Sequence, residues 1–315
     1  MNNFNDNAWQ ILQENLRSNH KLNVAVESRP CGAQIIDCGV NVRGGLEAGI
    51  LMARVGMAGM SEVGVYEGYL GDTLWQWVDV RSDEPLEACL LSQAAHWFVD
   101  VGAYKAMGSG PACLLRGKGE IIEAHPVKDN SSHAVLVLET RTLPEDAVCK
   151  AIAKECHVEP SALSILVAPT SSLAGSIQVG ARMVETALHK LHYLKFDFSK
   201  LVMATGRCPI AMPTGDDTVS LGKTNDAVIF GSLVWMAVTS LTQKEIEEWA
   251  AKIPSSQSPN YGEPFLQTLK KAGGFYNIDP GLFAPAEVTL VSLEGGKPVH
   301  AGKVDTHRLY SALLE

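Results

Sequence analysis

Arg182 and Glu185 stand three positions apart in the stretch GARMVETALHKLH, which runs from Gly180 to His192. Residues three apart share one side of a helix, so the guanidinium and the carboxylate can pair. A carboxylate held beside an arginine stays ionised when it is withdrawn from water, and it can then act as a general base. The same pair on a solvated helix would add only about 0.2–0.5 kcal/mol of helix stability. The spacing therefore allows two interpretations, an acid–base pair in a cleft or ordinary surface charge.

The residues around this pair weaken the surface interpretation without excluding it. On a 3.6-residue period, the stretch GSIQVGARMVETALHKLHYL predicts one helix with an apolar stripe and a neighbouring polar stripe. The apolar stripe is Ile177, Ala181, Val184, Leu188 and Leu191, and the polar stripe is Gln178, Arg182, Glu185 and His189. A solvated face usually carries several lysines and glutamates, and none occurs between Leu173 and Ala181. The small residues of that segment allow close approach of a substrate or of another helix.

The segments on either side predict the scaffold that positions this helix. Buried strands are predicted at 133–139, 163–169 and 200–206, with a helix at 145–156 between the first two. Alternation of strand and helix is typical of a parallel sheet with right-handed crossovers. Active sites of such sheets gather at the carboxyl ends of the strands, which here read APTSS and ATGRCP.

The remaining segments are consistent with a large α/β protein. A helix is predicted at 7–16, strands in LNVAVE and AQIIDCGV, and two strands, or a strand and a helix, in the apolar run 227–241. A chain of 315 residues is long enough for two domains. We predict an N-terminal α/β domain at 1–145 and a C-terminal α/β domain at 146–315 that carries the helix with Arg182, and either domain can be discontinuous.

Composition excludes some classes of protein. The chain is 46% hydrophobic and 19% charged, as globular proteins are, and its formal net charge is −9. That charge argues against a nucleic-acid partner, which needs a basic face. No apolar segment is long enough to favour a membrane span, and the N-terminus lacks the pattern of a signal peptide. Seven scattered cysteines then favour reduced thiols in the cytoplasm.

Several familiar motifs are incomplete. Gly108-x-Gly110 lacks the third glycine of a dinucleotide fingerprint, where Cys113 stands, and is better interpreted as a tight turn that opens a helix. LGKTND lacks the first glycine of a phosphate-binding loop, and the alternative is a turn before a buried strand AVIFG. His189 and His192 could share a metal, but no spacing supplies a third ligand. A phosphate- or nucleotide-using enzyme therefore remains only a minor alternative.

Long blocks of the sequence resemble one family. They are IDCGVNVRGGLEAG, AMGSGPA, LVAPTSSLAGSIQVGARMVETALHKLH, ATGRCPIAMPTGDD, GKTNDAVIFG, PNYGEPF and IDPGLFAPAEV, and they run from about Cys31 to about Val288. In this order they resemble the blocks of methenyltetrahydromethanopterin cyclohydrolases.

The resemblance implies a function as well as a fold. It implies hydrolysis of the methenyl bridge of a tetrahydromethanopterin carrier to the formyl form, in the one-carbon metabolism of methanogens and formaldehyde-oxidising bacteria. It also implies two α/β domains with the pterin in an active-site cleft between them, a homo-oligomer that is typically a trimer, and no metal or other cofactor. The family's proposed catalytic arginine and glutamate match Arg182 and Glu185 in this sequence.

Other positions are candidates for contact with the pterin. Gly108, Ser109 and Gly110 could line the pocket with backbone amides. Polar side chains that could read the ring are Gln178, Thr205, Asp216, Thr224, Asn225 and Asp226, although Asx residues also serve turns. Tyr261 and Phe283 could stack on the ring, and a core role is the alternative for Phe283.

One departure from the family's pattern is visible. The resemblance leads us to expect GSGPAR, and this chain has GSGPAC with Cys113 in the basic position. If that arginine touches the acidic tail of the carrier, affinity or carrier choice could differ here. A protein that holds the pterin carrier without hydrolysing it is the main alternative function, and retention of both Arg182 and Glu185 favours the enzyme.

Overall fold

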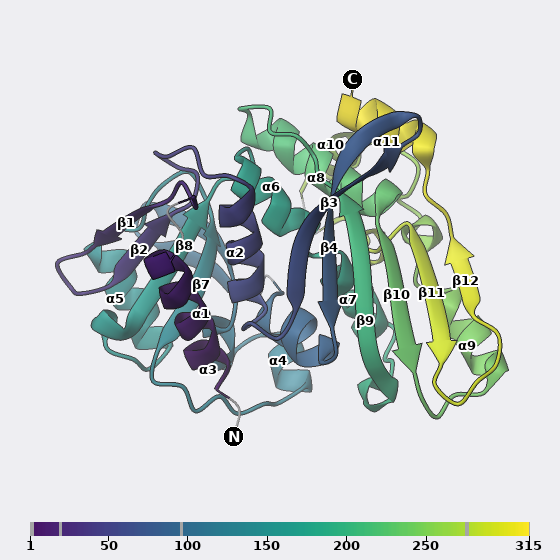
Figure 1. Ribbon diagram of the computed structural model, residues 1–315, viewed down its shortest axis with the longest axis horizontal. Coiled ribbons are helices and arrows are strands. Elements are labelled where there is room, and N and C mark those ends of the chain that lie inside the picture. The colour runs from purple at the N-terminus through teal and green to yellow at the C-terminus, as the bar shows by residue number, and fades with distance from the viewer. Residues whose placement is uncertain (1–2, 19–20, 95–96, 275–276, 315) are drawn as a thin grey trace. The chain divides into compact units, whose positions relative to one another are not determined.

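The computed structural model describes residues 3–18, 21–94, 97–274 and 277–314. The chain divides into two compact units, both discontinuous, and Figure 1 shows their elements. Unit 1 comprises residues 1–61 and 87–178, and unit 2 comprises residues 62–86 and 179–315. The predicted division after residue 145 falls inside unit 1, because the segments on both sides of it belong to one sheet.

Within its described residues, unit 1 contains a six-stranded mixed sheet in the order β1-β2-β8-β7-β6-β5. β2, β8 and β7 are parallel to one another, and the other neighbours pair antiparallel. The strands are β1 Ala25–Ser28, β2 Gln34–Asp37, β5 Trp97–Val101, β6 Tyr104–Ser109, β7 Ala134–Glu139 and β8 Leu163–Ala168.

Helices shield both faces of the central strands of unit 1. Every residue of β8 is buried, and so are the first five of β7, as expected of parallel strands covered on two sides. One core cluster joins α1 and α2 to β2, β7 and β8 (Figure 1). The helices are α1 Phe4–Ser18, α2 Leu46–Gly56, α3 Ala112–Arg116, α4 Glu120–Ala124 and α5 Asp146–Glu155, with a π-helical segment at Leu86–Ser92.

Within its described residues, unit 2 also contains a six-stranded sheet, in the order β12-β11-β10-β9-β4-β3. Among these described strands, only β10 and β11 are parallel, and the other neighbours pair antiparallel. The strands are β3 Glu62–Leu70, β4 Thr73–Ser82, β9 Leu201–Pro209, β10 Leu233–Val238, β11 Glu287–Ser292 and β12 Val299–Gly302.

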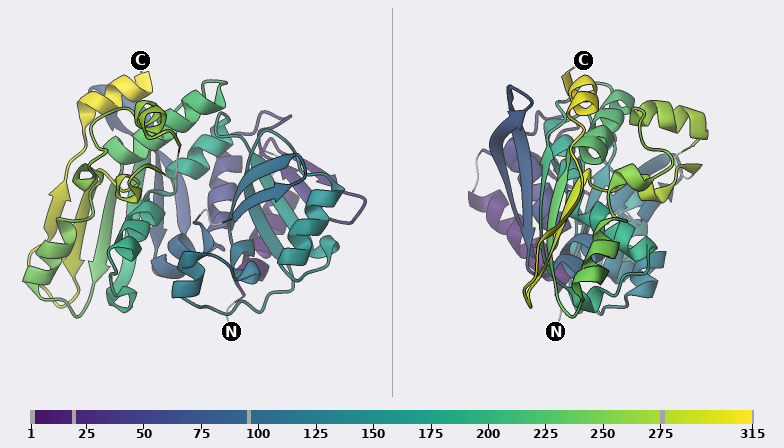
Figure 2. Two further views of the ribbon diagram at one scale, coloured as in Figure 1. Left: turned by 180° about the vertical axis from the view of Figure 1, so that it is seen from behind. Right: turned by 90° about the vertical axis from the view of Figure 1, so that its right-hand side faces the viewer.

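The sheet of unit 2 carries helices on one face. In β9, Ala204, Gly206 and Cys208 are buried, whereas Met203, Thr205 and Arg207 keep some exposure. This period of two is typical of a sheet with one covered face. Figure 2 shows helices of this unit on one side of strands β9 to β12. The helices are α7 Met183–Tyr193, α8 Asp217–Gly231, α9 Gln243–Ala250, α10 Phe265–Ala272 and α11 Thr306–Leu314, and α6 Leu173–Gly180 ends at the start of this unit.

The sequence predictions are confirmed for most of unit 1. The predicted helix at 7–16 lies inside α1, and the predicted helix at 145–156 is α5. The strands expected at 133–139 and 163–169 are β7 and β8, and they are parallel neighbours as predicted. The predicted strands in LNVAVE and AQIIDCGV are β1 and β2.

The third strand of the predicted parallel sheet is assigned wrongly. The expected strand at 200–206 is β9, but it lies in the sheet of unit 2 and pairs antiparallel with β4 and β10. ATGRCP is consequently part of β9 rather than a loop at its carboxyl end. The alternating burial of β9 is the physical reason, because a central parallel strand would be buried on both faces.

The apolar run 227–241 is a helix followed by a strand. The segment AVIFG, predicted as a strand after a turn, forms the last part of α8, and LGKTND lies in the middle of the same helix. Asp216 begins this helix, because its Oδ1 accepts hydrogen bonds from the N–H groups of Thr218 and Val219. Burial on all sides makes the end of α8 uniformly apolar, which removes the helical period from the sequence.

Candidate active site

The predicted single helix around Arg182 is broken in two. α6 ends at Gly180 and α7 begins at Met183. The N–H of Arg182 donates to the carbonyl of Val179 at 3.0 Å, which is a tight turn rather than a continuing α-helix. The break coincides with the passage of the chain from unit 1 to unit 2 after residue 178, so the two helices pack in different units.

Glycine allows α7 to lie close to its sheet. A Cβ atom at Gly206 of β9 would stand 2.6 Å from Cγ of Met183 and 2.9 Å from Cγ2 of Val184. Any larger residue would push the first turn of α7 away from β9, because Cβ atoms do not approach other atoms so closely. Met183 and Val184 are fully buried in this contact region. The packing therefore holds in place the turn that carries Glu185.

Arg182 and Glu185 form an ion pair at the start of α7. Nε and Nη2 of Arg182 each lie 3.2 Å from Oε2 of Glu185. The two side chains are only 13% and 9% exposed. In the described part of the chain no other group bonds to this carboxylate, so Oε1 can accept a further hydrogen bond. The pair is thus withdrawn from solvent, unlike an ordinary surface pair.

A second charged side chain on α7 is buried, and the sequence interpretation missed it. Lys190 is 6% exposed, and its Nζ donates to the carbonyl of Gly281 at 3.1 Å. Burial lowers the pKa of Lys190, and the nearby Asp279 opposes that change. Its signal in the sequence is its place in line with the apolar Met183 and Ala187, at helical spacing. Lys190 ties α7 to the 3₁₀ turn at Pro280–Leu282.

The candidates that precede Arg182 belong to unit 1. Gln178, on α6, is 5% exposed. Gly108 and Ser109 end β6, and Gly110 follows with a φ of 98° in a turn that leads into α3. The predicted tight turn that opens a helix is confirmed. Contact of these residues with a ligand stays a prediction.

Thr205 does not share the sheet face on which α7 packs. Gly206 faces Met183 and Val184 of α7, and neighbouring residues of a strand point to opposite faces. Thr205 therefore faces the other side of the sheet, beside Trp235 and Arg81 of the adjoining strands. The structure does not bring Thr205 together with Arg182 and Glu185.

The polar candidates of α8 have partners in the fold. Asp216 is the N-cap residue of that helix. The Oγ1 of Thr224 and the Nδ2 of Asn225 both donate to the carbonyl of Leu221, at 3.1 and 2.8 Å. These bonds are the local side-chain to backbone contacts that compete with ligand contacts. Substrate contact by these three residues stays a prediction.

Asp226 is the most unusual of the α8 candidates. It is 4% exposed, and its Oδ1 accepts a hydrogen bond from the N–H of Phe265 at 2.8 Å, at the start of α10. Burial raises the pKa of Asp226 to about 7, although the bond from Phe265 acts in the opposite direction. A carboxyl group of this kind is half protonated near neutral pH, so it can donate as well as accept.

The two aromatic candidates pack against other rings. Tyr261 meets Phe230 edge to face at 5.3 Å, and its hydroxyl donates to Asp305 at 3.4 Å. Burial, and then the negative charge of Asp305, raise the pKa of Tyr261. Phe283 meets Phe265 in the same way at 5.7 Å. The contacts agree with a packing role, and stacking on a ligand by Tyr261 stays a prediction.

Cys113 occupies an interior position of unit 1. It lies in α3 and is 1% exposed. Burial, and then the neighbouring thiol of Cys113, raise the pKa of Cys156, whose Sγ donates to the carbonyl of Ala112 at 3.6 Å. A buried thiol here cannot replace a basic group that reaches a ligand.

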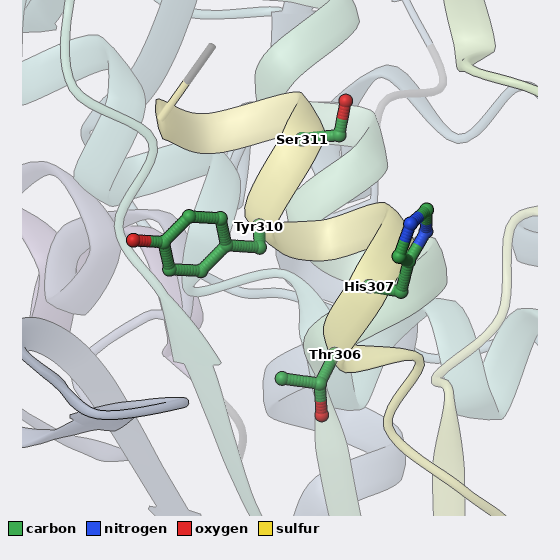
Figure 3. Close-up of a pocket in the computed structure, with 4 residues that line it drawn as sticks. All are labelled: Thr306, His307, Tyr310 and Ser311. Atoms are coloured by element: carbon green, nitrogen blue, oxygen red, sulfur yellow. The ribbon is translucent and has the colours of Figure 1, made fainter.

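A surface hollow of about 440 Å³ lies elsewhere in unit 2. It is lined by Thr306, His307, Tyr310 and Ser311 of α11, and Figure 3 shows Tyr310 and His307 pointing away from each other. None of the candidate residues lines it. Because a single helix lines it, we do not regard it as the active site.

Two negative findings concern the described residues alone. No group of three or more His, Cys, Asp or Glu side chains is arranged there to hold a metal ion. None of the helices in the described ranges is both long enough and apolar enough to cross a membrane.

Comparison with known proteins places the chain in a family. Residues 3–313 match the family model described as Cyclohydrolase (MCH). The chain is 39% identical over 306 residues to the methenyltetrahydromethanopterin cyclohydrolase of Methanococcoides burtonii, covering 96% of this chain and 95% of the relative. It is 41% identical over 305 residues to that of Methanospirillum hungatei, with coverage of 96% and 95%. It is 39% identical to that of Methanocaldococcus jannaschii over 315 aligned positions, with coverage of 98% and 97%. The chain therefore belongs to the family of methenyltetrahydromethanopterin cyclohydrolases.

Proposed function

We propose that this protein hydrolyses methenyl-tetrahydromethanopterin to the formyl form, with Glu185 as the general base and Arg182 as its positioning and stabilising partner. The observation that carries the proposal is the secluded pair itself. Among the described residues, the contacts between Arg182 and Glu185 go to Oε2, so Oε1 can accept a hydrogen bond from the attacking water.

The chemistry suits such a pair. The methenyl carbon lies between two nitrogens that share its positive charge, so it is electrophilic without further activation. Water adds to this carbon while Glu185 takes one of its protons. Glu185 then passes that proton to the departing nitrogen as its bond to carbon breaks. The hydroxyl proton leaves as the C=O bond forms, so the overall reaction consumes one water and releases one proton.

Arg182 has two tasks in this proposal. Its two contacts to Oε2 fix the rotamer of Glu185. Its guanidinium also provides a donor for oxygen as negative charge develops there. Lysine cannot make two fixed contacts to one oxygen in this way, because it lacks a planar fork.

Several narrower features belong to the same proposal. Gly108, Ser109, Gly110, Gln178 and Asp226 are the candidates that bind the pterin carrier. The protein is a cytoplasmic homo-oligomer, with a trimer as the expected form, and the reaction requires no added cofactor. Burial of Cys113 supports a different mode of binding for the acidic tail of the carrier.

The test follows the near-ultraviolet chromophore of the methenyl carrier, which disappears on hydrolysis. Glu185→Gln should reduce the turnover rate at least about 10²-fold, because a positioned general base contributes about 10²–10⁴-fold. Glu248→Gln is the control, since Glu248 is exposed on α9, and it should leave turnover unchanged. Full activity of Glu185→Gln would end the assignment of the base. Tight binding without absorbance loss above the buffer rate would show a carrier-binding protein instead.

A further inference from the structure

Asp226 of α8 is a buried carboxyl group of which the fold uses only one oxygen. It is 4% exposed, and its Oδ1 accepts the N–H of Phe265 at 2.8 Å. Within the described ranges, Oδ2 accepts no hydrogen bond and no cation pairs with the carboxylate. Nor does Oδ2 belong to the unpaired side-chain atoms that the described part of the fold seals from solvent. A buried carboxylate oxygen normally has a partner, and here a ligand can supply it.

The structural role of Asp226 does not require its charge. The bond to Phe265 satisfies one of the free N–H groups at the start of α10, where the N-cap residue Pro264 has no side-chain acceptor. Asparagine accepts such a bond as well as aspartate does, and it brings no charge that must be desolvated. Burial raises the pKa of Asp226 to about 7, so the fold disfavours the charged form. The second carboxylate oxygen therefore serves a purpose other than capping α10.

Two glycines show where the helices of this region converge on β9. α7 and α8 both pack on that strand. A Cβ atom at Gly231, the last residue of α8, would stand 2.9 Å from Cγ of Pro209. A Cβ atom at Gly180, the last residue of α6, would lie 4.0 Å from Sγ of Cys208. The end of α8 and the residue before the turn into α7 therefore contact adjacent residues of β9.

This convergence places Asp226 in the same layer of unit 2 as the pair Arg182 and Glu185. Asp226 precedes the last residue of α8 by five positions, and Arg182 follows the last residue of α6 by two. At about 1.5 Å per helical residue, the two sites are separated by roughly 10 Å along the helices. Such a separation suits one flat fused-ring ligand that is recognised at both of its ends.

The surroundings of Asp226 are suited to a flat ring. Phe265, whose N–H bonds to Asp226, meets the ring of Phe283 edge to face at 5.7 Å. Phe283 keeps some exposure, whereas Phe265 is fully buried. Ligand pockets typically combine apolar and aromatic walls with a few polar groups that fix the orientation of the ligand. An aromatic wall beside one half-used carboxylate is a combination of this kind.

The pterin ring carries donors that match a carboxylate. Its pyrimidine half has an amino group at position 2, an N–H at position 3 and a carbonyl at position 4, so two N–H groups point in parallel from one edge. A carboxylate accepts such a pair with its two oxygens, as it does from the fork of an arginine. Oδ1 can take part although it is bonded to Phe265, because each carboxylate oxygen has two lone pairs. Two donors also favour the charged form that burial disfavours.

We propose that Asp226 binds the 2-amino-4-oxo edge of the pterin and selects this ring over one with an oxygen at position 2. The proposal rests on the proposed function, and it adds the orientation of the substrate, with the pyrimidine edge at α8 and the methenyl carbon at Glu185. Thr224 and Asn225 are poorer candidates for this contact, because their side chains donate to the carbonyl of Leu221.

The experiment compares two small head groups, 6-methyl-tetrahydropterin and the corresponding 2-oxo compound, 6-methyl-tetrahydrolumazine. Calorimetry measures their binding to the full-length protein, and the absorbance assay measures KM and kcat for the methenyl carrier. The wild type should bind the pterin at least about tenfold more tightly than the lumazine, as expected for hydrogen bonds to a charged group.

Asp226→Asn is the decisive variant, because it keeps the acceptor for Phe265 and replaces Oδ2 by an NH₂ group. That group opposes the 2-amino donor and suits a 2-oxo acceptor, so the preference between the two head groups should reverse. KM for the methenyl carrier should rise at least about tenfold. The kcat should change far less, since Asp226 does not touch the reacting carbon. Asp72→Asn, in the exposed turn between β3 and β4, is the control and should keep the wild-type values.

The outcomes separate this inference from the proposed function. Equal binding of the two head groups by the wild type would overturn the role of Asp226, and so would a folded Asp226→Asn variant with the wild-type KM and preference. If the variant does not fold, the wild-type preference decides, and if neither head group binds measurably, KM of the variant decides. Absence of hydrolysis by the wild type would overturn the proposed function, whereas the calorimetric comparison of the head groups does not depend on turnover.

Discussion

The strongest test of the candidate site is a double-mutant cycle on Arg182 and Glu185. Arg182→Met removes the guanidinium and leaves a carboxylate that is only 9% exposed. Breaking a buried ion pair from one side costs about 3–5 kcal/mol, because the remaining charge is desolvated and unpaired. We expect about 3 kcal/mol, at the lower end, since some exposure remains. In a unit of about 150–250 residues, that loss lowers Tm by about 6–12 °C.

The double variant is the decisive member of the cycle. Glu185→Gln alone leaves the guanidinium buried beside a neutral amide and should cost about 2 kcal/mol. Arg182→Met with Glu185→Gln removes both charges together, so it should cost clearly less than the sum of the two single changes. A coupling free energy of at least about 1.5 kcal/mol follows for groups in direct contact.

Unfolding free energies from urea titrations of the four proteins provide the measurement. The matched control is the exposed pair Lys244 and Glu248 on α9, whose charged atoms are 3.8 Å apart and whose side chains are 85% and 55% exposed. That pair should show no resolvable coupling. If the coupling between Arg182 and Glu185 is also below about 0.5 kcal/mol, the value for a solvated helix pair, then the pair is not secluded in solution and the mechanism loses its basis.

Three further predictions concern turnover and the dependence of stability on pH. Glu185→Gln should slow turnover at least about 10²-fold in the absorbance assay, with Glu248→Gln unchanged, because general-base catalysis is lost. Gly206→Ala should cost about 1–3 kcal/mol of unfolding free energy and reduce turnover about tenfold or more. The new Cβ displaces Met183 and Val184, and with them the turn that carries Glu185. A variant with wild-type turnover would show that α7 tolerates the shift. Burial raises the pKa of Asp226 from 3.8 to about 7, so the folded state keeps a proton that the unfolded chain releases, and stability from this group falls as pH rises through that window. Asp226→Asn keeps the acceptor for the Phe265 N–H. It should raise the unfolding free energy at pH 8 by up to roughly 4 kcal/mol, with no gain at pH 4 or below. Urea titrations between pH 4 and pH 8 measure this gain, and a gain that does not vary with pH would contradict the prediction.

Local patterns in the sequence predicted the elements of unit 1 well. The sequence signals for β7, α5 and β8 are clear. The two strands are runs of buried residues and the helix has an amphipathic period, and both patterns are formed by residues close together in the chain. The stripe Ile177, Ala181, Val184, Leu188 and Leu191 is buried as predicted. The paired positions of Arg182 and Glu185 also follow from the sequence, since a spacing of three survives the break before α7.

Non-local contacts decided what the patterns could not. The sequence between β8 and β9 carries no signal that β9 joins a different sheet. The sheet to which β9 belongs is defined by its antiparallel pairing with β4 and β10. The end of α8, AVIFG, has the pattern of a strand because its residues are buried on every side, which removes the helical period. Gly206 lies on the sheet face that packs on α7, whereas Thr205 lies on the opposite face. The tertiary structure determines which of the two faces α7 covers.

The sequence by itself determined which side chains could perform acid–base chemistry, the helical spacing between them and the family blocks around them. Only the tertiary structure decided that Arg182 and Glu185 are withdrawn from water and that the helix breaks beside them. The physical reason is that periodicity reflects neighbours along the chain. Burial and strand pairing depend on residues far away in the sequence, which meet only when the whole chain has folded.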